Sequence, residues 1–181
     1  MSVADSSRDL LVRWNAALAN AEPGYVAMID RFDPGERDAA RAAHAWLVTD
    51  GLRGESVPYL WIRDGELLGF FSLAMGQIEL RSSHLKRLDP PQQRPTQPAV
   101  LLTWIVKTPR PDVDGEWLLL QAVGLAGETA STIAATVLAL DPFDIETADM
   151  WAKHYGARAS KTRLHGGTEE RPLKRMFLEL P

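Results

Sequence analysis

A candidate phosphate-binding turn lies in the stretch Ile105–Val123, IVKTPRPDVDGEWLLLQAV. An apolar run ends in a proline-bracketed turn with one glycine, and a second apolar run follows at once, which is the order of a strand, a loop and a helix. Backbone amides at the start of such a helix bind anions. Asp112, Asp114 and Glu116 oppose this chemistry, because they bring three carboxylates to the place where an anion would lie.

The composition is that of a folded globular chain, with 45% hydrophobic and 24% charged residues among 181. One domain is expected at this length. The absence of cysteine excludes thiolate nucleophiles and agrees with a reducing cytoplasm. A formal net charge of −4 argues against tight, nonspecific nucleic-acid binding. No apolar run is long enough for a membrane span and the N-terminus has no signal-peptide pattern, so we expect a cytoplasmic location.

The remaining polar residues do not indicate metal or nucleophile chemistry. Helical zinc sites need histidines four residues apart, and the histidines here lack that spacing, so we expect no metal. They are His44, His84, His154 and His165. Ser72 and Ser83 lack the context of a nucleophile elbow. His84 lies in a basic loop beside Lys86 and Arg87, where we expect a solvated side chain.

The first half of the chain is predicted to form two helices and a hairpin. Apolar residues at helical spacing predict helices over Ser6–Ala21 and Pro34–Leu52, and Asp33 before the proline is suited to cap the second helix. Val57–Ile62 and Glu66–Leu80 are predicted strands, joined by a short turn that contains Asp-Gly. Gly69 or Gly76 is expected to mark a bulge or bend in the second strand.

The second half is predicted to alternate between strands and helices. The expected elements are a proline-rich loop over Leu88–Pro98, a buried strand over Ala99–Lys107, a helix over Gly115–Leu125, a buried strand over Thr132–Leu140, a helix over Ile145–Tyr155 and a last strand over Arg175–Pro181. A hairpin that leads into a strand–helix–strand unit indicates a mixed α/β sheet, antiparallel at its start and parallel at its centre.

Several segments share the order of motifs found in one superfamily. These are Phe32 and Gly35 with Trp46-Leu47, the strand Leu67–Glu79 with its aromatic, Ser-Leu-Ala and glycine, the basic loop His84–Arg87 with Asp89-Pro90, the helix end Ala148–Ala157 and the terminal Phe177–Pro181. In this order the chain resembles a GNAT-fold N-acetyltransferase. Within that superfamily it is most similar to the small toxin-type proteins that acetylate aminoacyl-tRNA.

The resemblance implies a single GNAT-like domain over residues 1–181, with a mixed central sheet and an N-terminal helical extension over residues 1–30. It also implies transfer of an acetyl group from acetyl-CoA to an amine acceptor such as aminoacyl-tRNA, and either an antitoxin partner or a homodimer. The pantetheine arm would pair with the backbone of Ile105, Val106 and Lys107. The substrate loop would include Ser72, Lys86 and Arg87.

The sequence departs from the family pattern at the pyrophosphate loop. Where the family has several glycines at the start of the central helix, this chain has Arg110–Trp117 with one glycine. Two interpretations are open. In one, Lys107 and Arg110 bind phosphate together with the amides of Gly115 and Glu116. In the other, Asp114 caps the helix and Glu116 complements its dipole.

The second departure concerns the proton donor. The family's tyrosine, which can act as general acid toward the thiolate leaving group, corresponds to Ala152 here. Tyr155 lies three residues further on and could replace it if the helix end is shifted, or could serve in packing alone.

Two functions therefore follow from the sequence. One is an acetyltransferase that uses acetyl-CoA. The other is a degenerate GNAT-fold protein without acyl-CoA binding that acts as a binding or regulatory module. Three basic pieces could form an RNA-binding patch or could be solvated loops: Lys86-Arg87, Lys161–Arg163 and Lys174-Arg175.

Overall fold

The computed structural model describes residues 9–88 and 94–180, which form two compact units. The first unit contains the chain up to Ser72 together with Trp104–Leu120, and the second contains Leu73–Thr103 together with the chain from Gln121 onward. The beginning of the helix expected from Ser6 and the Asp89-Pro90 pair of the basic loop lie outside the described residues. No helix in the described ranges has the length and apolar composition needed to cross a membrane.

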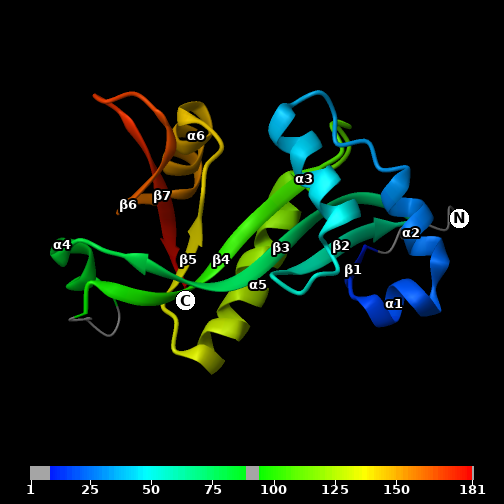
Figure 1. The fold of residues 1–181 in the computed structure, drawn as a ribbon, viewed down its shortest axis with the longest axis horizontal. Helices are drawn as coiled ribbons and strands as arrows, with labels where there is room; N and C mark the ends of the chain where they lie inside the picture. The colour runs from blue at the N-terminus through cyan, green and yellow to red at the C-terminus, as the bar shows by residue number, and fades with distance from the viewer. Residues whose placement is uncertain (1–8, 89–93, 181) are drawn as a thin grey trace, which may run out of the picture. The chain divides into compact units, whose positions relative to one another are not determined.

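The elements follow one another along the chain as Figure 1 shows. They are β1 Leu10–Arg13, α1 Ala16–Ala21, α2 Pro23–Asp30, α3 Asp38–Thr49, β2 Val57–Arg63, β3 Glu66–Glu79, α4 Ser82–Leu85, β4 Thr96–Lys107, α5 Gly115–Ile133, β5 Val137–Leu140, α6 Ile145–Tyr155, β6 Arg158–Gly167 and β7 Pro172–Glu179. The strand order is β1-β2-β3-β4-β5-β7-β6. β4 and β5 run parallel, whereas β5 and β6 both run antiparallel to β7. The mixed sheet with a parallel pair at its centre confirms the predicted fold class.

The hairpin β2–β3 forms where the sequence predicts it. Asp64 and Gly65 in its turn have positive φ angles of 51° and 77°. A two-residue turn with two positive φ angles matches the twist of the flanking strands, and Asp-Gly is a pair that adopts it readily. Local turn chemistry therefore sets the register of this hairpin.

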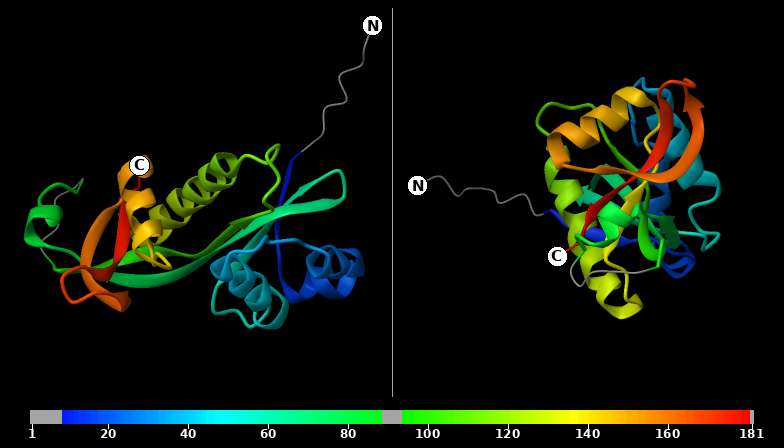
Figure 2. Two further views of the ribbon diagram at one scale, coloured as in Figure 1. Left: turned by 90° about the horizontal axis from the view of Figure 1, so that it is seen from above. Right: turned by 90° about the vertical axis from the view of Figure 1, so that its left-hand side faces the viewer.

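The core of the first unit is built on the two-residue period of β2. Leu60 and Ile62 belong to a buried cluster that also contains Ala43 and Leu47 of α3. Trp61 points to the opposite face, where its ring stacks on Trp117 of α5 at 4.6 Å. Figure 2 shows α1, α2 and α3 on one face of β1 and β2.

The core of the second unit joins β3, β4, β5 and β7. Its buried residues are Ile78, Leu80, Leu85, Leu88, Ala99, Val137, Ala139 and Phe177. Gly76 in β3 is needed for this packing, because a Cβ atom there would lie 2.4 Å from the side chain of Leu101 in β4. In the first unit, Gly69 allows an equally close approach, since a Cβ atom would lie 2.7 Å from the carbonyl oxygen of Val106.

The helix predicted over Ser6–Ala21 is wrong for its first part. Leu10–Arg13 forms β1, which pairs antiparallel with β2 in the register Leu10↔Ile62 to Arg13↔Tyr59. Asp9 holds the start of this strand, because its carboxylate accepts hydrogen bonds from Trp61 and Arg63. These partners are more than 50 residues away, so local periodicity did not reveal the strand.

The start of α3 also differs from the prediction. The helix begins at Asp38 with Arg37 at the N-cap position, not at Pro34. The Asp33 carboxylate accepts a hydrogen bond from the Gly35 amide at 2.8 Å and so closes a turn before the helix. Gly35 has a φ angle of 82°, and a Cβ atom there would lie 3.3 Å from Pro109. Asp33 thus shapes the loop rather than capping the helix.

The structure also changes the bounds of α5, β4, β5 and β7 and adds the elements α4 and β6. β4 begins at Thr96 instead of Ala99, and β7 begins at Pro172 instead of Arg175. α5 runs to Ile133 instead of Leu125, and Gly124 and Gly127 lie within it. β5 consequently starts at Val137. β6, over Arg158–Gly167, was not predicted, since its exposed edge carries mostly polar residues and lacks a clear apolar alternation.

Candidate functional site

The edge of β4 extends beyond its neighbour β5. The two strands pair from Val100↔Leu138 to Leu102↔Leu140, where β5 ends, while β4 continues to Lys107. The continuation includes the predicted pantetheine-binding residues, of which Val106 is 9% exposed and Ile105 is half-buried. An extended chain can bind such an edge through backbone hydrogen bonds, as in strand addition. β4 thus continues past its last pair with β5, Leu102↔Leu140.

Lys107 folds back over the turn that follows β4. Its ammonium donates to the carbonyl oxygen of Thr108 at 3.0 Å and to that of Arg110 at 3.4 Å. Its side chain also runs beside Gly115, where a Cβ atom would lie 3.2 Å from the Lys107 Cδ. Gly115 therefore makes room for the lysine stem, and the ammonium is engaged by backbone oxygens of the turn.

Arg110 is held between two carboxylates. Its Nη1 donates to Glu66 at 2.6 Å, while its Nε and Nη2 donate to the two oxygens of Asp112 at 3.2 and 2.7 Å. The Asp112 contact is bidentate, which is the geometry in which guanidinium and carboxylate bind most strongly. The hydrogen bond from Arg110 lowers the pKa of Asp112. Asp112 and then Glu66 raise the pKa of Arg110 in turn.

A carboxylate of the chain also binds the first turn of α5. The Asp114 carboxylate accepts a hydrogen bond from the Glu116 amide at 2.9 Å. Asp114 directly precedes the helix, which begins at Gly115, and Glu116 lies in its first turn. This confirms the interpretation in which Asp114 caps the helix. The Glu116 amide, one of the predicted phosphate donors, is engaged by this carboxylate.

Tyr155 ends α6 in the second unit. Asp144 caps the start of the helix by accepting from the Thr147 amide at 2.7 Å, and Gly156 closes it with a φ angle of 69°. The Tyr155 ring lies 5.0 Å from the ring of Trp151, and the residue is 38% exposed. Ala152, at the position of the family's tyrosine, is exposed.

The three residues predicted for the substrate loop lie in different environments. Ser72 is fully buried in β3, in the first unit. Lys86 and Arg87 are exposed just after α4, in the second unit. The structure therefore describes the two cations as a surface feature and Ser72 as a core residue.

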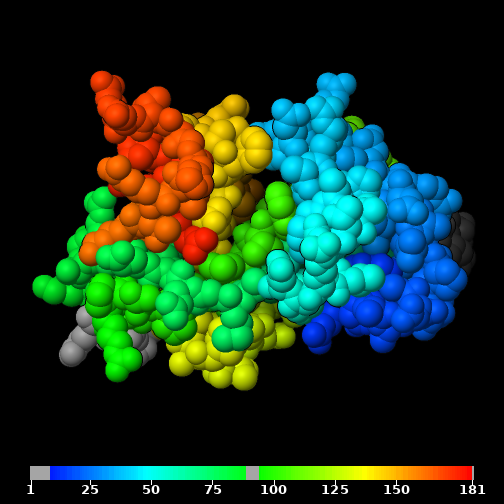
Figure 3. Space-filling model, in the orientation of Figure 1, coloured from blue at the N-terminus to red at the C-terminus, as the bar shows by residue number. Residues whose placement is uncertain are grey.

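A basic cluster surrounds α4, and we define it as Arg81, Lys86, Arg87 and Arg158. The first three are exposed, and none of their charged groups forms an ion pair within the ranges that the structure describes. In the space-filling view, the green chain around α4 lies at the surface beside the orange β6 (Figure 3). Arg158 pairs with Glu179 at 2.7 Å.

His84 lies at the centre of the basic cluster and is not solvated as predicted. Its ring contacts Phe177 at 5.2 Å, and its Nδ1 is buried without a hydrogen-bond partner among the described residues. Burial lowers the pKa of His84, and the charges of Arg158, Arg81 and Arg87 lower it further. Three arginines of the cluster, Arg81, Arg87 and Arg158, thus disfavour the charged form of the His84 imidazole.

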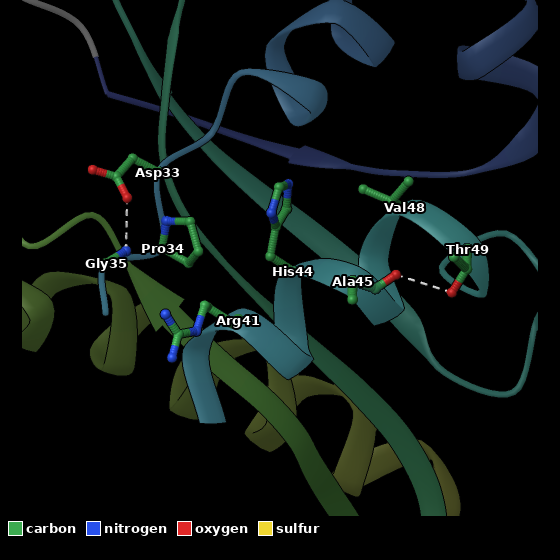
Figure 4. Close-up of a pocket in the computed structure, with 8 residues that line it drawn as sticks. All are labelled: Asp33, Pro34, Gly35, Arg41, His44, Ala45, Val48 and Thr49. Atoms are coloured by element: carbon green, nitrogen blue, oxygen red, sulfur yellow. Dashed lines mark hydrogen bonds between the residues drawn. The ribbon is translucent and has the colours of Figure 1, made fainter. Parts of the chain in front are cut away.

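An open hollow lies beside α3 in the first unit. Its volume is about 550 Å³. The lining residues, drawn in Figure 4, are Asp33, Pro34, Gly35, Arg41, His44, Ala45, Val48 and Thr49. Their polar groups are largely engaged: Arg41 pairs with Asp38 at 2.6 Å, and the His44 Nε2 lies 2.7 Å from the carbonyl oxygen of Ile29. No group of three His, Asp or Glu side chains in residues 9–88 and 94–180 could hold a metal ion.

Sequence reasoning missed Glu66, Arg81 and Arg158. Glu66 lies 44 residues from Arg110, and the sequence indicates only that it starts a strand. Arg158 lies on the unpredicted β6. The basic run near Lys86 was a usable signal for Arg81, because the three cations follow one another within seven residues.

The mixed seven-stranded sheet, with β4 continuing past the parallel β5, has the GNAT fold. Solved structures that share it include a mutant of KacT (TM-score 0.69, 14% identity, covering 96% of this chain and 95% of that one) and AtaT complexed with acetyl-methionyl-tRNAfMet (0.65, 16%, 95% of each). A third is a tyrosine-to-phenylalanine mutant of the toxin AtaT bound to acetyl-CoA and the C-terminus of the antitoxin AtaR (0.61, 15%, 96% and 94%). No protein family's sequence model and no curated protein matches the chain.

The two parts of the candidate site fit coenzyme A unequally. The β4 edge offers backbone groups that suit an extended pantetheine. The turn before α5 does not fit a pyrophosphate as it stands, because Arg110 and the Glu116 amide already bind carboxylates.

Proposed function

We propose that this protein is an N-acetyltransferase that moves the acetyl group of acetyl-CoA to an amine of an acceptor, in the cytoplasm. The observation that carries the proposal is the match to AtaT and KacT over 95–96% of the chain. The β4 edge supports it, because strand-like backbone is available at Ile105, Val106 and Lys107.

Acetyl transfer requires little chemistry from side chains. The amine nitrogen attacks the thioester carbonyl, a C–N bond forms, the C–S bond breaks, and the proton lost by the amine ends on the leaving thiolate. Holding the two reactants in contact and donating a hydrogen bond to the carbonyl oxygen supply most of the acceleration. Backbone amides can provide both, so the alanine at residue 152 is compatible with this reaction.

Tyr155 is our candidate general acid for the thiolate. It is the tyrosine of α6, and its 38% exposure leaves it accessible from solvent. The variant Tyr155→Phe keeps the ring contact with Trp151 and removes the proton. A tenfold or larger loss of kcat, with acetyl-CoA affinity unchanged, would support the role. An unchanged kcat would assign Tyr155 to packing.

We propose aminoacyl-tRNA as the acceptor. AtaT, which shares the fold, has been captured with acetyl-methionyl-tRNAfMet. The basic cluster supports the proposal, because the exposed cations of Arg81, Lys86 and Arg87 are available to phosphates at low cost. It also explains how a chain of net charge −4 could bind RNA, since the charge is local.

We further propose that an antitoxin neutralises the protein. The support is that a mutant of AtaT has been solved bound to the C-terminus of the antitoxin AtaR and that a KacTA–DNA complex has been solved. Co-expression with the reading frames that flank its gene, followed by co-purification, tests this. Full toxicity in the presence of every neighbouring gene product would contradict it.

Acetyl transfer itself is tested by incubating the protein with acetyl-CoA and a pool of charged tRNA, and detecting acetylated aminoacyl groups by mass spectrometry. Deacylated tRNA is the control, since it lacks the amine. The proposal predicts acetylation of at least one charged species and release of free thiol. If no charged tRNA is acetylated and no thiol is released, the protein acts instead as a binding or regulatory module.

A further inference from the structure

Carboxylates of the chain occupy two of the predicted pyrophosphate donors, Arg110 and the Glu116 amide, while the Lys107 ammonium donates to backbone carbonyl oxygens. The Asp112 and Glu66 carboxylates bind all the nitrogens of the Arg110 guanidinium, and the Asp114 carboxylate binds the Glu116 amide. We call this arrangement the carboxylate latch and define it as Glu66, Arg110, Asp112 and Asp114. All four residues belong to the first unit.

The charge balance around the turn reinforces the latch. Its cations are Lys107 and Arg110, whereas its acids are Glu66, Asp112, Asp114 and Glu116, so acids outnumber cations in the turn. The charge of Arg63 also reaches Asp112, but Arg63 is itself paired with Asp9. Pro111 contributes no amide donor. A pyrophosphate would have to displace two carboxylates from Arg110 and approach two further acids, whereas an uncharged ligand would meet no such repulsion.

Uncharged pantetheine is the part of coenzyme A that the β4 edge can hold. β4 continues from Leu102 to Lys107 past the end of β5, and this backbone lies outside the latch. The affinity for the acyl donor would then come from the pantetheine arm and not from the nucleotide.

We infer that the latch makes this protein indifferent to the nucleotide of its donor, so that its donor class is acetyl thioesters of pantetheine in general, with or without the phosphorylated adenosine. The inference rests on the proposed acetyl transfer. With acetyl-pantetheine, the acceptor amine forms the amide, the C–S bond breaks, and the released pantetheine thiol takes up the proton.

The experiment compares acetyl-CoA and S-acetyl-pantetheine as ligands and as donors. Thermal-shift titration gives both dissociation constants for the wild type, because a ligand that binds the native state raises the melting temperature. We expect the two constants to agree within about threefold, and kcat/KM for the two donors to agree similarly. An enzyme that binds the pyrophosphate would instead bind acetyl-CoA about 100-fold more tightly than S-acetyl-pantetheine, which is the contribution of two charge-assisted hydrogen bonds.

The double variant Glu66→Gln/Asp112→Asn opens the latch. It frees the Arg110 guanidinium, so acetyl-CoA affinity should rise about tenfold while acetyl-pantetheine affinity stays the same. Asp38→Asn is the matched control, because it removes a carboxylate from another exposed ion pair of the same unit, 2.6 Å from Arg41. The control should change neither affinity.

The outcomes separate the inference from the proposed function. If the wild type prefers acetyl-CoA strongly and Arg110→Ala removes the preference, Arg110 leaves the latch to bind phosphate; the inference is then overturned and the acetyltransferase stands. If neither ligand binds the wild type or the opened variant, both the inference and the proposed function are wrong, because the β4 edge does not hold pantetheine. Equal affinities in the wild type with no gain for acetyl-CoA in the opened variant would also overturn the role of the latch.

Discussion

The cations in the turn before α5 are paired within the chain, whereas most cations of the basic cluster around α4 have no ion-pair partner among the described residues. In the turn, Arg110 binds two carboxylates and Lys107 binds two carbonyl oxygens. In the cluster, the exposed Arg81, Lys86 and Arg87 have no carboxylate partner within the described ranges. The charges of Arg158, Arg81 and Arg87 lower the pKa of His84. A cation in a phosphate-binding motif therefore indicates a phosphate site only when the fold leaves it without a carboxylate partner. The predictions below test this difference.

The largest effect is expected from reversing charge in the basic cluster. The double variant Arg81→Glu/Arg87→Glu should weaken binding of charged tRNA by about 100-fold at moderate salt, because it replaces two phosphate contacts by two repulsive charges. Fluorescence anisotropy with labelled tRNA measures the change.

Arg171→Glu serves as the control for this reversal, since Arg171 belongs to the same unit but is paired with Asp149. It should weaken tRNA binding no more than about threefold. If the control weakens binding as much as the double variant does, only net charge matters and the distinction between paired and unpaired cations is wrong.

A half-buried ion pair should matter for stability, in contrast to the exposed latch. The Asp9 carboxylate accepts from Trp61 at 2.7 Å and from Arg63 at 2.8 Å. Asp9→Asn should lower the free energy of unfolding at pH 7 by about 1–2 kcal/mol. Arg110→Ala should leave the melting temperature almost unchanged, because its partners are solvent-exposed.

The pH dependence of the Asp9 effect follows from its pKa. The hydrogen bond from Arg63 lowers the pKa of Asp9 below its ordinary value of 3.8. A carboxylate with a lowered pKa stabilises the fold fully above its unfolded pKa and loses that contribution as the pH falls through the folded one. Urea melts of the wild type and Asp9→Asn should therefore converge below about pH 4, and a constant difference down to pH 2 would contradict this.

The salt dependence of tRNA binding resolves single lysines. Lys86→Ala should lower the slope of log K against log salt by about one unit, because one phosphate contact is lost. Lys161→Ala is the matched control, since Lys161 pairs with Glu79 at 3.1 Å. Its slope should equal that of the wild type, and equal slopes for both variants would place the RNA elsewhere.

The smallest effect is a shift at His84. NMR titration should give a pKa below the ordinary value of 6.5, because burial and nearby cations both disfavour the imidazolium. Arg81→Gln/Arg87→Gln should raise this pKa, though only in part, since burial is the larger cause. Arg171→Gln should not change it. A His84 pKa that is unaffected by loss of both arginines would show that their charges do not act on this ring.

Elements with local signals were predicted well. The Asp-Gly turn identified the hairpin β2–β3, and Gly156 with Asp144 bounded α6. The apolar runs located β4 and β5 and so indicated the mixed sheet. Asp114 as the cap of α5 was one of two interpretations that the sequence left open, and the structure confirms it with a hydrogen bond between residues two positions apart.

Elements without local signals were missed for one physical reason, which is that their partners are distant in the sequence. β1 was taken for a helix because its residues satisfy a helical spacing, and only pairing with β2 makes them a strand. β6 exposes one side to solvent and carries polar residues there, so its periodicity is weak.

The sequence by itself determined the hairpin β2–β3, the buried strands β4 and β5 on either side of a helix, and a turn before α5 that is poor in glycine and rich in acids. Only the tertiary structure decided which charges are engaged. The fold brings Glu66 to Arg110 across 44 residues and brings Arg158 to the cations of α4. Ion pairing depends on distances of a few ångströms in space, and spacing along the chain does not fix those distances.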